Sequence, residues 1–289
     1  MIPAAFLQAW SARVPWPDQR QVEQDLVICR ALCDLFNADA LAETIAFRGG
    51  TAIHKLLFAR PLRYSEDIDL VQTKAGPIGK TVDAIRGALA WLGPCKRTQA
   101  THSMHLYFSF TAEGDAAAKL KLKVEINTRE HSPLYPIRAY PFSVQNPWYT
   151  ATSNIRSFAP EELFGTKLRA LLQRRKSRDL FDLNEGLTQL QLDPSMVIAA
   201  FEHYLAAQGA KITRAQAEEF MLSKLTRSLT DDIAPLLPAG ITYDAGDALA
   251  AFTKIWFELI TRIEGDPWRR RDTVIKRLRE TLGDTFLRG

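Results

Sequence analysis

Two aspartates separated by a single residue, Asp67 and Asp69, are the side chains of this sequence that most directly suggest chemistry. They lie in the run Asp-Ile-Asp-Leu-Val (67–71), which predicts a β-strand with both carboxylates on one face. Two neighbouring carboxylates repel each other unless a cation lies between them. Hard oxygen ligands favour Mg²⁺, with Mn²⁺ as the alternative. The pair therefore predicts a divalent-metal site suited to phosphoryl or nucleotidyl transfer.

A glycine turn precedes the two aspartates by some sixteen residues. A short apolar strand is predicted over 45–47, and a helix over 51–58, with two glycines and a threonine at the junction. Backbone N–H groups and a hydroxyl at a helix N-terminus bind phosphate, because the helix dipole favours anions there. We therefore predict a nucleotide-binding loop. Its predicted residues are Gly49, Gly50, Thr51, Ser65 and Lys55.

A further acidic residue, Glu125, lies on a second predicted strand. The segment 120–127 alternates apolar and polar residues, and Glu125 lies on its polar face with three lysines at positions 119, 121 and 123. Glu125 is the best candidate to join Asp67 and Asp69 at the metal, although alternating Lys and Glu is also ordinary for an exposed strand. An aromatic-rich strand over 104–110 and a turn at 113–115 predict a hairpin with it.

The segment 167–178 is strongly basic and contains no acidic residue. On one continuous helix at about 100° per residue, Lys167, Arg174 and Arg178 share a line, while Lys176 faces the opposite way. A solvated surface is the ordinary interpretation of such a run, and contact with RNA phosphates is the functional one. The predicted RNA-binding residues are Arg174, Arg175 and Arg178.

Three blocks, in this order, carry a resemblance: Phe-Arg-Gly-Gly-Thr-Ala-Ile-His-Lys (47–55), Tyr-Ser-Glu-Asp-Ile-Asp-Leu (64–70), and Lys-Leu-Arg-Ala-Leu-Leu-Gln-Arg-Arg-Lys-Ser-Arg-Asp-Leu-Phe-Asp-Leu (167–183). They resemble the nucleotidyltransferase superfamily of DNA polymerase beta. More narrowly, they resemble the AbiEii/AbiGii-type toxin family, which includes the MenT-like toxins. The resemblance implies a Mg²⁺-dependent toxin that moves a nucleoside monophosphate from an NTP onto RNA. In MenT-like members the acceptor is the 3′ end of tRNA, so that translation is blocked.

The resemblance also implies a cognate antitoxin as partner and two later essential residues, Lys167 and Asp182, although Asp179 fits the aspartate almost as well. Together with Asp67 and Asp69, Lys167 and Asp182 are the predicted catalytic residues. On one unbroken helix, fifteen residues separate Lys167 from Asp182 by about 22 Å. The two can share a site only if the helix breaks between them.

Composition and periodicity predict the organisation of the remaining chain. A length of 289 residues with 46% hydrophobic and 24% charged residues is typical of a globular protein, and a net charge of +4 permits a polyanionic partner. No membrane segment is predicted, and three cysteines without metal-ligand spacing favour the reduced cytoplasm. The predicted fold is α+β. A mixed nucleotidyltransferase sheet flanked by helices (1–158) precedes an all-helical half (159–289) that contributes Lys167 and Asp182 to the site.

The segment 129–158 is predicted to be a connector with one short strand near 139–144. Beyond it, helices are predicted over 194–208, 213–224, 229–237, 245–264 and 270–282. Two other functions remain open. One is a small-molecule nucleotidyltransferase with a similar first half, and the other is a non-catalytic module that binds a nucleotide or a partner.

Overall fold

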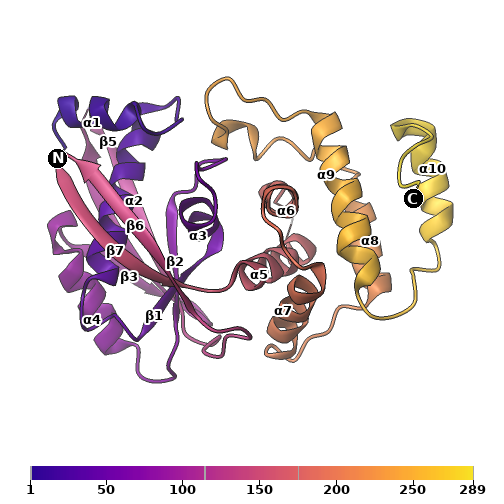
Figure 1. The fold of residues 1–289 in the computed structure, drawn as a ribbon, viewed down its shortest axis with the longest axis horizontal. Helices are drawn as coiled ribbons and strands as arrows, with labels where there is room; N and C mark the ends of the chain where they lie inside the picture. The colour runs from indigo at the N-terminus through magenta and orange to yellow at the C-terminus, as the bar shows by residue number, and fades with distance from the viewer. Residues whose placement is uncertain (1, 114, 175, 289) are drawn as a thin grey trace. The chain divides into compact units, whose positions relative to one another are not determined.

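A computed structural model describes residues 2–113, 115–174 and 176–288 of the chain (Figure 1). The chain divides into two compact units. The first consists of Met1–Ala159 and Leu237–Ile241, and the second of Pro160–Leu236 and Thr242–Gly289. Each unit is described separately.

The first unit is built on a mixed sheet of strand order β3-β4-β5-β2-β1-β7-β6. Its central strand β2 pairs antiparallel with β1 and parallel with β5, and β1 pairs parallel with β7. This sheet and its helices confirm the predicted fold class. The strands are β1 (Ile45–Arg48), β2 (Asp67–Gln72), β3 (Cys95–Gln99), β4 (Ser103–Ala112), β5 (Asp115–Asn127), β6 (Arg138–Asn146) and β7 (Tyr149–Ser157).

Helices cover one face of this sheet. They are α1 (Ala4–Ser11), α2 (Gln19–Phe36), α3 (Gly49–Leu56) and α4 (Gly79–Ala88), followed by the short 3₁₀ helix η1 (Ala90–Leu92). The long helix α2 packs against β5, β6 and β7, and α1 and α4 pack against α2 (Figure 1). The side chains of Leu122, Val124 and Ile126 on β5 are fully buried. Because side chains alternate along a strand, the intervening polar residues of β5 lie on the opposite face.

Three strands of the first unit differ from the sequence prediction. The connector predicted over 129–158 contains a long hairpin, β6–β7, rather than one short strand. The first half of β7 alternates half-buried and exposed residues, so it lacks the apolar period that marks a half-buried strand. The edge strand β3 was also missed, because four of its five residues are exposed. The tip of the predicted 113–115 turn, Gly114, lies outside the described residues.

The second unit is helical, as predicted. Its helices are α5 (Pro160–Gln173), α6 (Arg178–Gln189), α7 (Pro194–Ala206), α8 (Arg214–Lys224), α9 (Ala245–Glu258) and α10 (Arg271–Leu282), with 3₁₀ helices η2 (Ala234–Leu236) and η3 (Ile260–Arg262). Asp193, Thr213 and Asp244 accept backbone hydrogen bonds at the starts of α7, α8 and α9. A Cβ on Gly165 would lie 2.6 Å from the Ala200 Cβ, so the glycine permits close packing of α5 on α7.

Two predicted helices of the second unit are shorter than expected. The helix predicted over 229–237 is reduced to η2, because Pro235 and Pro238 remove hydrogen-bond donors and restrict the preceding residues. The helix predicted over 245–264 ends at Glu258 and is followed by η3.

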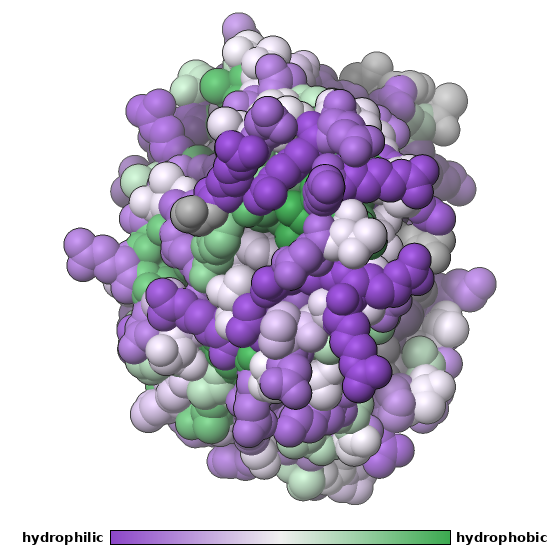
Figure 2. Space-filling view, turned by 90° about the vertical axis from the view of Figure 1, so that its right-hand side faces the viewer, coloured by the Kyte–Doolittle hydropathy of each residue, from purple (hydrophilic) through white to green (hydrophobic). Residues whose placement is uncertain are grey.

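The surface seen from the side of α8, α9 and α10 is mainly hydrophilic, with small separated apolar areas (Figure 2). The helix α10 buries only Ile275 among its twelve residues, which matches this polar surface. Within the described part of the chain, the helices lack the combination of length and apolar character that a membrane crossing needs.

Candidate active site

The two aspartates of β2 lie beside Glu125 in the sheet. In the parallel pairing of β2 and β5, Asp69 is opposite Glu125, and Asp67 is opposite Lys123. The Nζ atom of Lys123 lies 2.7 Å from Glu125 Oε2 and 3.6 Å from Asp67 Oδ2. The structure therefore brings the three predicted metal ligands to one face, with the amino group of a lysine among them.

The electrostatics of this cluster favour an added cation. Burial raises the pKa of Asp69, and the neighbouring charges of Glu125 and Asp67 raise it further. Burial would also raise the pKa of Glu125, but the hydrogen bond and charge of Lys123 hold it below its ordinary value. One lysine in contact with two of three carboxylates leaves a local excess of negative charge. These oxygen donors fit a divalent cation.

In the present arrangement, no three acidic, His or Cys side chains of the described residues form a ready ligand set for a metal. The amino group of Lys123 supplies positive charge at this place and contacts Glu125 and Asp67. Sequence reasoning assigned Lys123 no role beyond the polar face of its strand. The pairing of β2 with β5 places Lys123 opposite Asp67, where its positive charge lies among the carboxylates.

The glycine turn lies directly against the carboxylates. Gly49, the first residue of α3, has a φ of +80°. A Cβ at this position would lie 2.1 Å from Asp69 Oδ2. Both the backbone conformation and the available space therefore require glycine, and the N-terminus of α3 adjoins the Asp69 side chain.

We expect Gly49→Ala to destabilise the protein by about 1–3 kcal/mol, because alanine is strained at positive φ and its Cβ displaces Asp69. Urea unfolding measures this loss. The matched control is Gly79→Ala at the start of α4, where a Cβ would meet no atom within 4 Å and φ is not positive. Equal stability of the two variants would contradict the close approach of Gly49 and Asp69.

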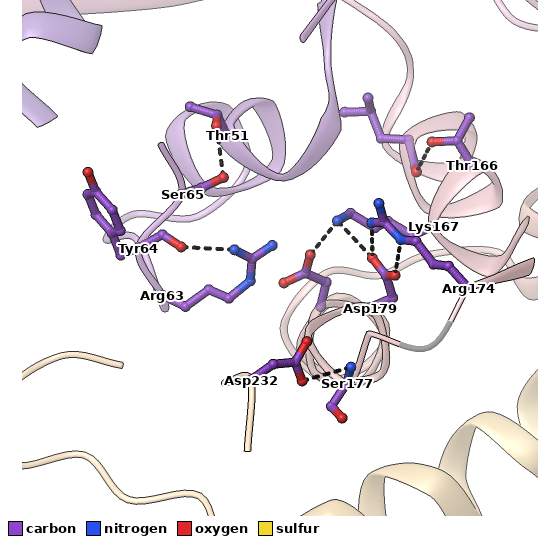
Figure 3. Close-up of polar contacts among 12 residues, drawn as sticks. Thr51, Arg63, Tyr64, Ser65, Thr166, Lys167, Arg174, Ser177, Asp179 and Asp232 are labelled. Atoms are coloured by element: carbon purple, nitrogen blue, oxygen red, sulfur yellow. Dashed lines mark hydrogen bonds and ion pairs between the residues drawn. The ribbon is translucent and has the colours of Figure 1, made fainter. Parts of the chain in front are cut away.

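The hydroxyl of Thr51 ties α3 to the start of β2. Thr51 is buried, and its Oγ1 lies 2.8 Å from Ser65 Oγ (Figure 3). The same hydroxyl donates a hydrogen bond to the Asp67 carbonyl. Thr51 and Ser65 thus hold the glycine loop and the first aspartate at a fixed separation. This geometry makes Thr51 a positioning residue.

Arg63 is a buried cation beside the loop that sequence reasoning missed. Its side chain is 2% exposed, and its Nη1 donates to the Tyr64 carbonyl at 2.9 Å (Figure 3). A Cβ on Gly50 would lie 2.7 Å from Arg63 Nη2. Nothing in the local sequence separates Arg63 from the nearby Arg60, so only the fold identifies it.

The structure places the amino group of Lys55, a predicted nucleotide contact, against α2. Its Nζ lies 2.6 Å from the Asp25 Oδ1 atom and 3.3 Å from the Cys29 Sγ atom, both on α2. Burial raises the pKa of the Cys29 thiol to about 12, although the positive charge of Lys55 acts to lower it. Lys55 lies a full turn beyond Thr51, about 6 Å further along α3. It anchors the helix to the interior.

A second cluster of charges lies within the helical unit. The helix α5 ends at Gln173 and α6 begins at Arg178, so the chain turns between Lys167 and the two aspartates. Lys167 Nζ lies 2.7 Å from Asp182 Oδ2 and 3.2 Å from Asp179 Oδ1, and all three side chains are buried (Figure 3). Both candidate aspartates therefore contact the lysine.

The break between α5 and α6 overturns the single-helix geometry used for the basic segment. Arg174, a predicted RNA contact, is paired with Asp179, with Nε–Oδ2 at 2.6 Å and Nη2–Oδ1 at 2.7 Å. Arg178 begins α6 and is half-buried, and Lys176 is exposed. Arg175 lies outside the described residues. A long-range contact accompanies the break: the Ser177 N–H donates to Asp232 Oδ1 at 2.9 Å (Figure 3).

The ion cluster gives a pH prediction. Burial would raise the pKa of Asp179, but Lys167 and Arg174 hold it below its ordinary value. Its stabilising contribution is therefore complete above the ordinary aspartate pKa of about 4 and is lost as pH falls below it. We expect Asp179→Asn to cost about 2–3 kcal/mol in urea unfolding between pH 5 and 7. The difference from wild type should shrink below about pH 4, and a pH-independent difference would contradict the ionic account.

The family model "Nucleotidyl transferase AbiEii toxin, Type IV TA system" matches residues 30–251. The structure resembles MenT4, a nucleotidyltransferase toxin from Mycobacterium tuberculosis, with a TM-score of 0.63 and 18% identity over 100% of both chains. It also resembles JHP933 from Helicobacter pylori, with a TM-score of 0.53 and 15% identity over 92% of this chain and 97% of that one.

The sequence has no significant match among curated proteins. The two structural likenesses, both below 25% identity, support the fold, and the family model covers most of the chain, including both charged clusters. The protein belongs to the AbiEii family of nucleotidyltransferase toxins of toxin–antitoxin systems.

Proposed function

We propose that this nucleotidyltransferase transfers a nucleoside monophosphate from an NTP onto RNA, at the 3′ end of tRNA, and so blocks translation in the cytoplasm until a cognate antitoxin restrains it. The observation that carries the proposal is the contact between the glycine loop and the carboxylates. The N-terminus of α3, where backbone N–H groups favour phosphate, adjoins Asp69, and Asp67 and Glu125 lie on the same face.

Residues of the first unit have separate roles in binding the metal, binding the triphosphate and positioning the loop. Asp67 and Asp69 would hold the metal, with Glu125 as third ligand, and α3 would present its first N–H groups to the triphosphate. A bound Mg²⁺ would supply Lewis-acid activation of the attacking hydroxyl and would neutralise charge on the phosphates. Arg63, behind Gly50, offsets further phosphate charge. Ser65 and Thr51 keep the loop in place.

We further propose that Lys167 and Asp182 are required for transfer. Lysine is a compact point charge that suits contact with phosphate, and Asp182 orients it through the 2.7 Å contact. Asp179 forms ion pairs with both Arg174 and Lys167, so its role is to hold the Lys167 amino group in position.

The function is tested by incubating the pure protein with total RNA and each of the four NTPs, labelled at the α-phosphate, in Mg²⁺, Mn²⁺ or EDTA. We expect one or more NTPs to label RNA of tRNA size at its 3′ end, and EDTA to prevent labelling. Absence of RNA labelling with all four NTPs, together with transfer onto a small hydroxyl compound, would favour the small-molecule alternative. The salt dependence of acceptor binding separates the two, because only a polyanion releases many counterions.

A further inference from the structure

The sheet face that carries the carboxylates continues outward as a polar surface across β5, β4 and β3. Opposite residues in paired strands lie on one face. Tyr107 is opposite Lys123 on one side and Lys96 on the other, and His105 is opposite Glu125. We call the part of this surface beyond the carboxylates the β3–β5 face; its members His105 and Tyr107 are half-buried and the others are exposed. It comprises Lys96, Thr98, His105, Tyr107, Ser109, Lys119 and Lys121.

Two rings extend from the carboxylates along this face. His105 Nε2 lies 3.5 Å from Glu125 Oε2, and its Nδ1 lies 3.3 Å from the Tyr107 hydroxyl. The two rings meet edge to face, with centroids 6.1 Å apart. Lys121 Nζ lies 4.2 Å from the centroid of the Tyr107 ring. A continuous row of contacts thus leads from the carboxylates to an aromatic side chain flanked by lysine.

Three lysines of this face lie at the surface. Lys96, Lys119 and Lys121 are exposed, and among the described side chains none of the three is in an ion pair with a carboxylate, although Lys121 contacts the Tyr107 ring. Along β5, Lys119 and Lys121 lie about 7 Å apart on the same face. Lysines beside an aromatic ring on an open sheet match the requirements of single-stranded nucleic acid, which needs cations for phosphates and rings for stacking.

We propose that the β3–β5 face binds the single-stranded 3′-terminal nucleotides of the acceptor RNA, with a base stacked on Tyr107 and phosphates on Lys96, Lys119 and Lys121. The inference rests on the proposed function for the identity of the acceptor. The row of contacts ends at Glu125, so a strand bound on this face leads its terminal hydroxyl toward the carboxylates. An acidic protein segment would also meet the lysines, but the ring beside them favours a base.

The test measures RNA binding without NTP, so that no transfer takes place. The probe is a single-stranded RNA about twelve nucleotides long with a 5′ fluorophore and a free 3′ end, followed by fluorescence anisotropy. We expect Tyr107→Ala to weaken binding about 5- to 150-fold, as loss of one stacked base does. Tyr107→Phe, which retains the ring, should bind close to wild type.

A pair of double variants tests the phosphate contacts. Lys119→Ala with Lys121→Ala should lower the slope of log affinity against log salt by about 1.4, because each single-strand phosphate contact contributes about 0.7. The matched control, Lys74→Ala with Lys80→Ala, removes two exposed lysines away from this face and should leave the slope unchanged. Equal slopes for the two double variants, or wild-type binding by Tyr107→Ala, would overturn the proposal.

Two further measurements separate this inference from its alternatives. In the first, polyglutamate is tested as a competitor and as a direct ligand. If it displaces the RNA, and if Tyr107→Ala weakens polyglutamate binding by the same factor as RNA binding, the face is a protein-docking surface and the proposal is overturned. If the Tyr107 and double-lysine variants bind RNA like the wild type and still transfer nucleotide onto it, the proposed function stands and the β3–β5 face is rejected as the RNA site. RNA binding that depends on Tyr107, without transfer onto any RNA, would preserve the face and reject the function.

Discussion

Replacing Asp67 by alanine is expected to reduce nucleotide transfer by about three orders of magnitude, equivalent to about 4 kcal/mol of transition-state stabilisation. The change removes one carboxylate from the face on which Asp69 and Glu125 lie opposite each other. Stability should be unchanged or slightly raised, because Asp67 is one of the charges that raise the pKa of Asp69. Transfer is measured with a labelled NTP, and stability by thermal unfolding.

The matched control is Glu66→Ala, which removes an exposed acid one position earlier in the chain. Glu66 precedes β2 and should be dispensable for transfer. Near wild-type transfer by the Asp67 variant, or equal losses from both changes, would show that the metal-binding carboxylates are assigned wrongly.

Lys167→Met should destabilise the protein by about 3–5 kcal/mol, because it removes the amino group that contacts two buried carboxylates, Asp179 and Asp182. Asp179 and Asp182 are fully buried, and Arg174 stays paired with Asp179 after the change. The free energy of urea unfolding measures the effect, and transfer is assayed at a temperature where the variant remains folded.

A compensating change separates the structural role of Lys167 from its chemical role. Lys167→Met combined with Asp182→Asn removes one charge of each sign, so the Arg174–Asp179 pair is again balanced. We expect this double variant to regain most of the lost stability but no transfer. Recovery of both properties would mean that Lys167 serves only the fold.

The sequence predicted the parts of the site whose geometry is local. A strand fixes which side chains share a face, so the placement of Asp67 and Asp69 followed from their spacing alone, and the two glycines at 49–50 indicated the turn beside them. The prediction for Glu125 needed one more fact, the register of β2 on β5, which the alternation of the strand could suggest but not determine.

The remaining features depend on contacts between distant segments. The end of α5 coincides with the packing of Lys167 on Asp179 and Asp182 and with the bond from Ser177 to Asp232, which lies 55 positions away. Lys55 is a cation close in sequence to the glycine turn, as a phosphate contact would be, but in the structure it forms an ion pair with Asp25 on another helix. Local patterns carry no information about such partners, and for the same reason they did not reveal Arg63.

The Asp25 carboxylate that binds Lys55 also binds two tryptophans, which makes the position of α3 accessible to fluorescence. The indole N–H groups of Trp10 and Trp16 donate to the Asp25 oxygens at 3.1 Å and 3.0 Å, and Lys55 of α3 binds the same carboxylate. A ligand that shifts α3 must therefore disturb the surroundings of two indole rings. We expect intrinsic tryptophan emission to change during titration with NTP if the nucleotide binds at the glycine loop, as we propose.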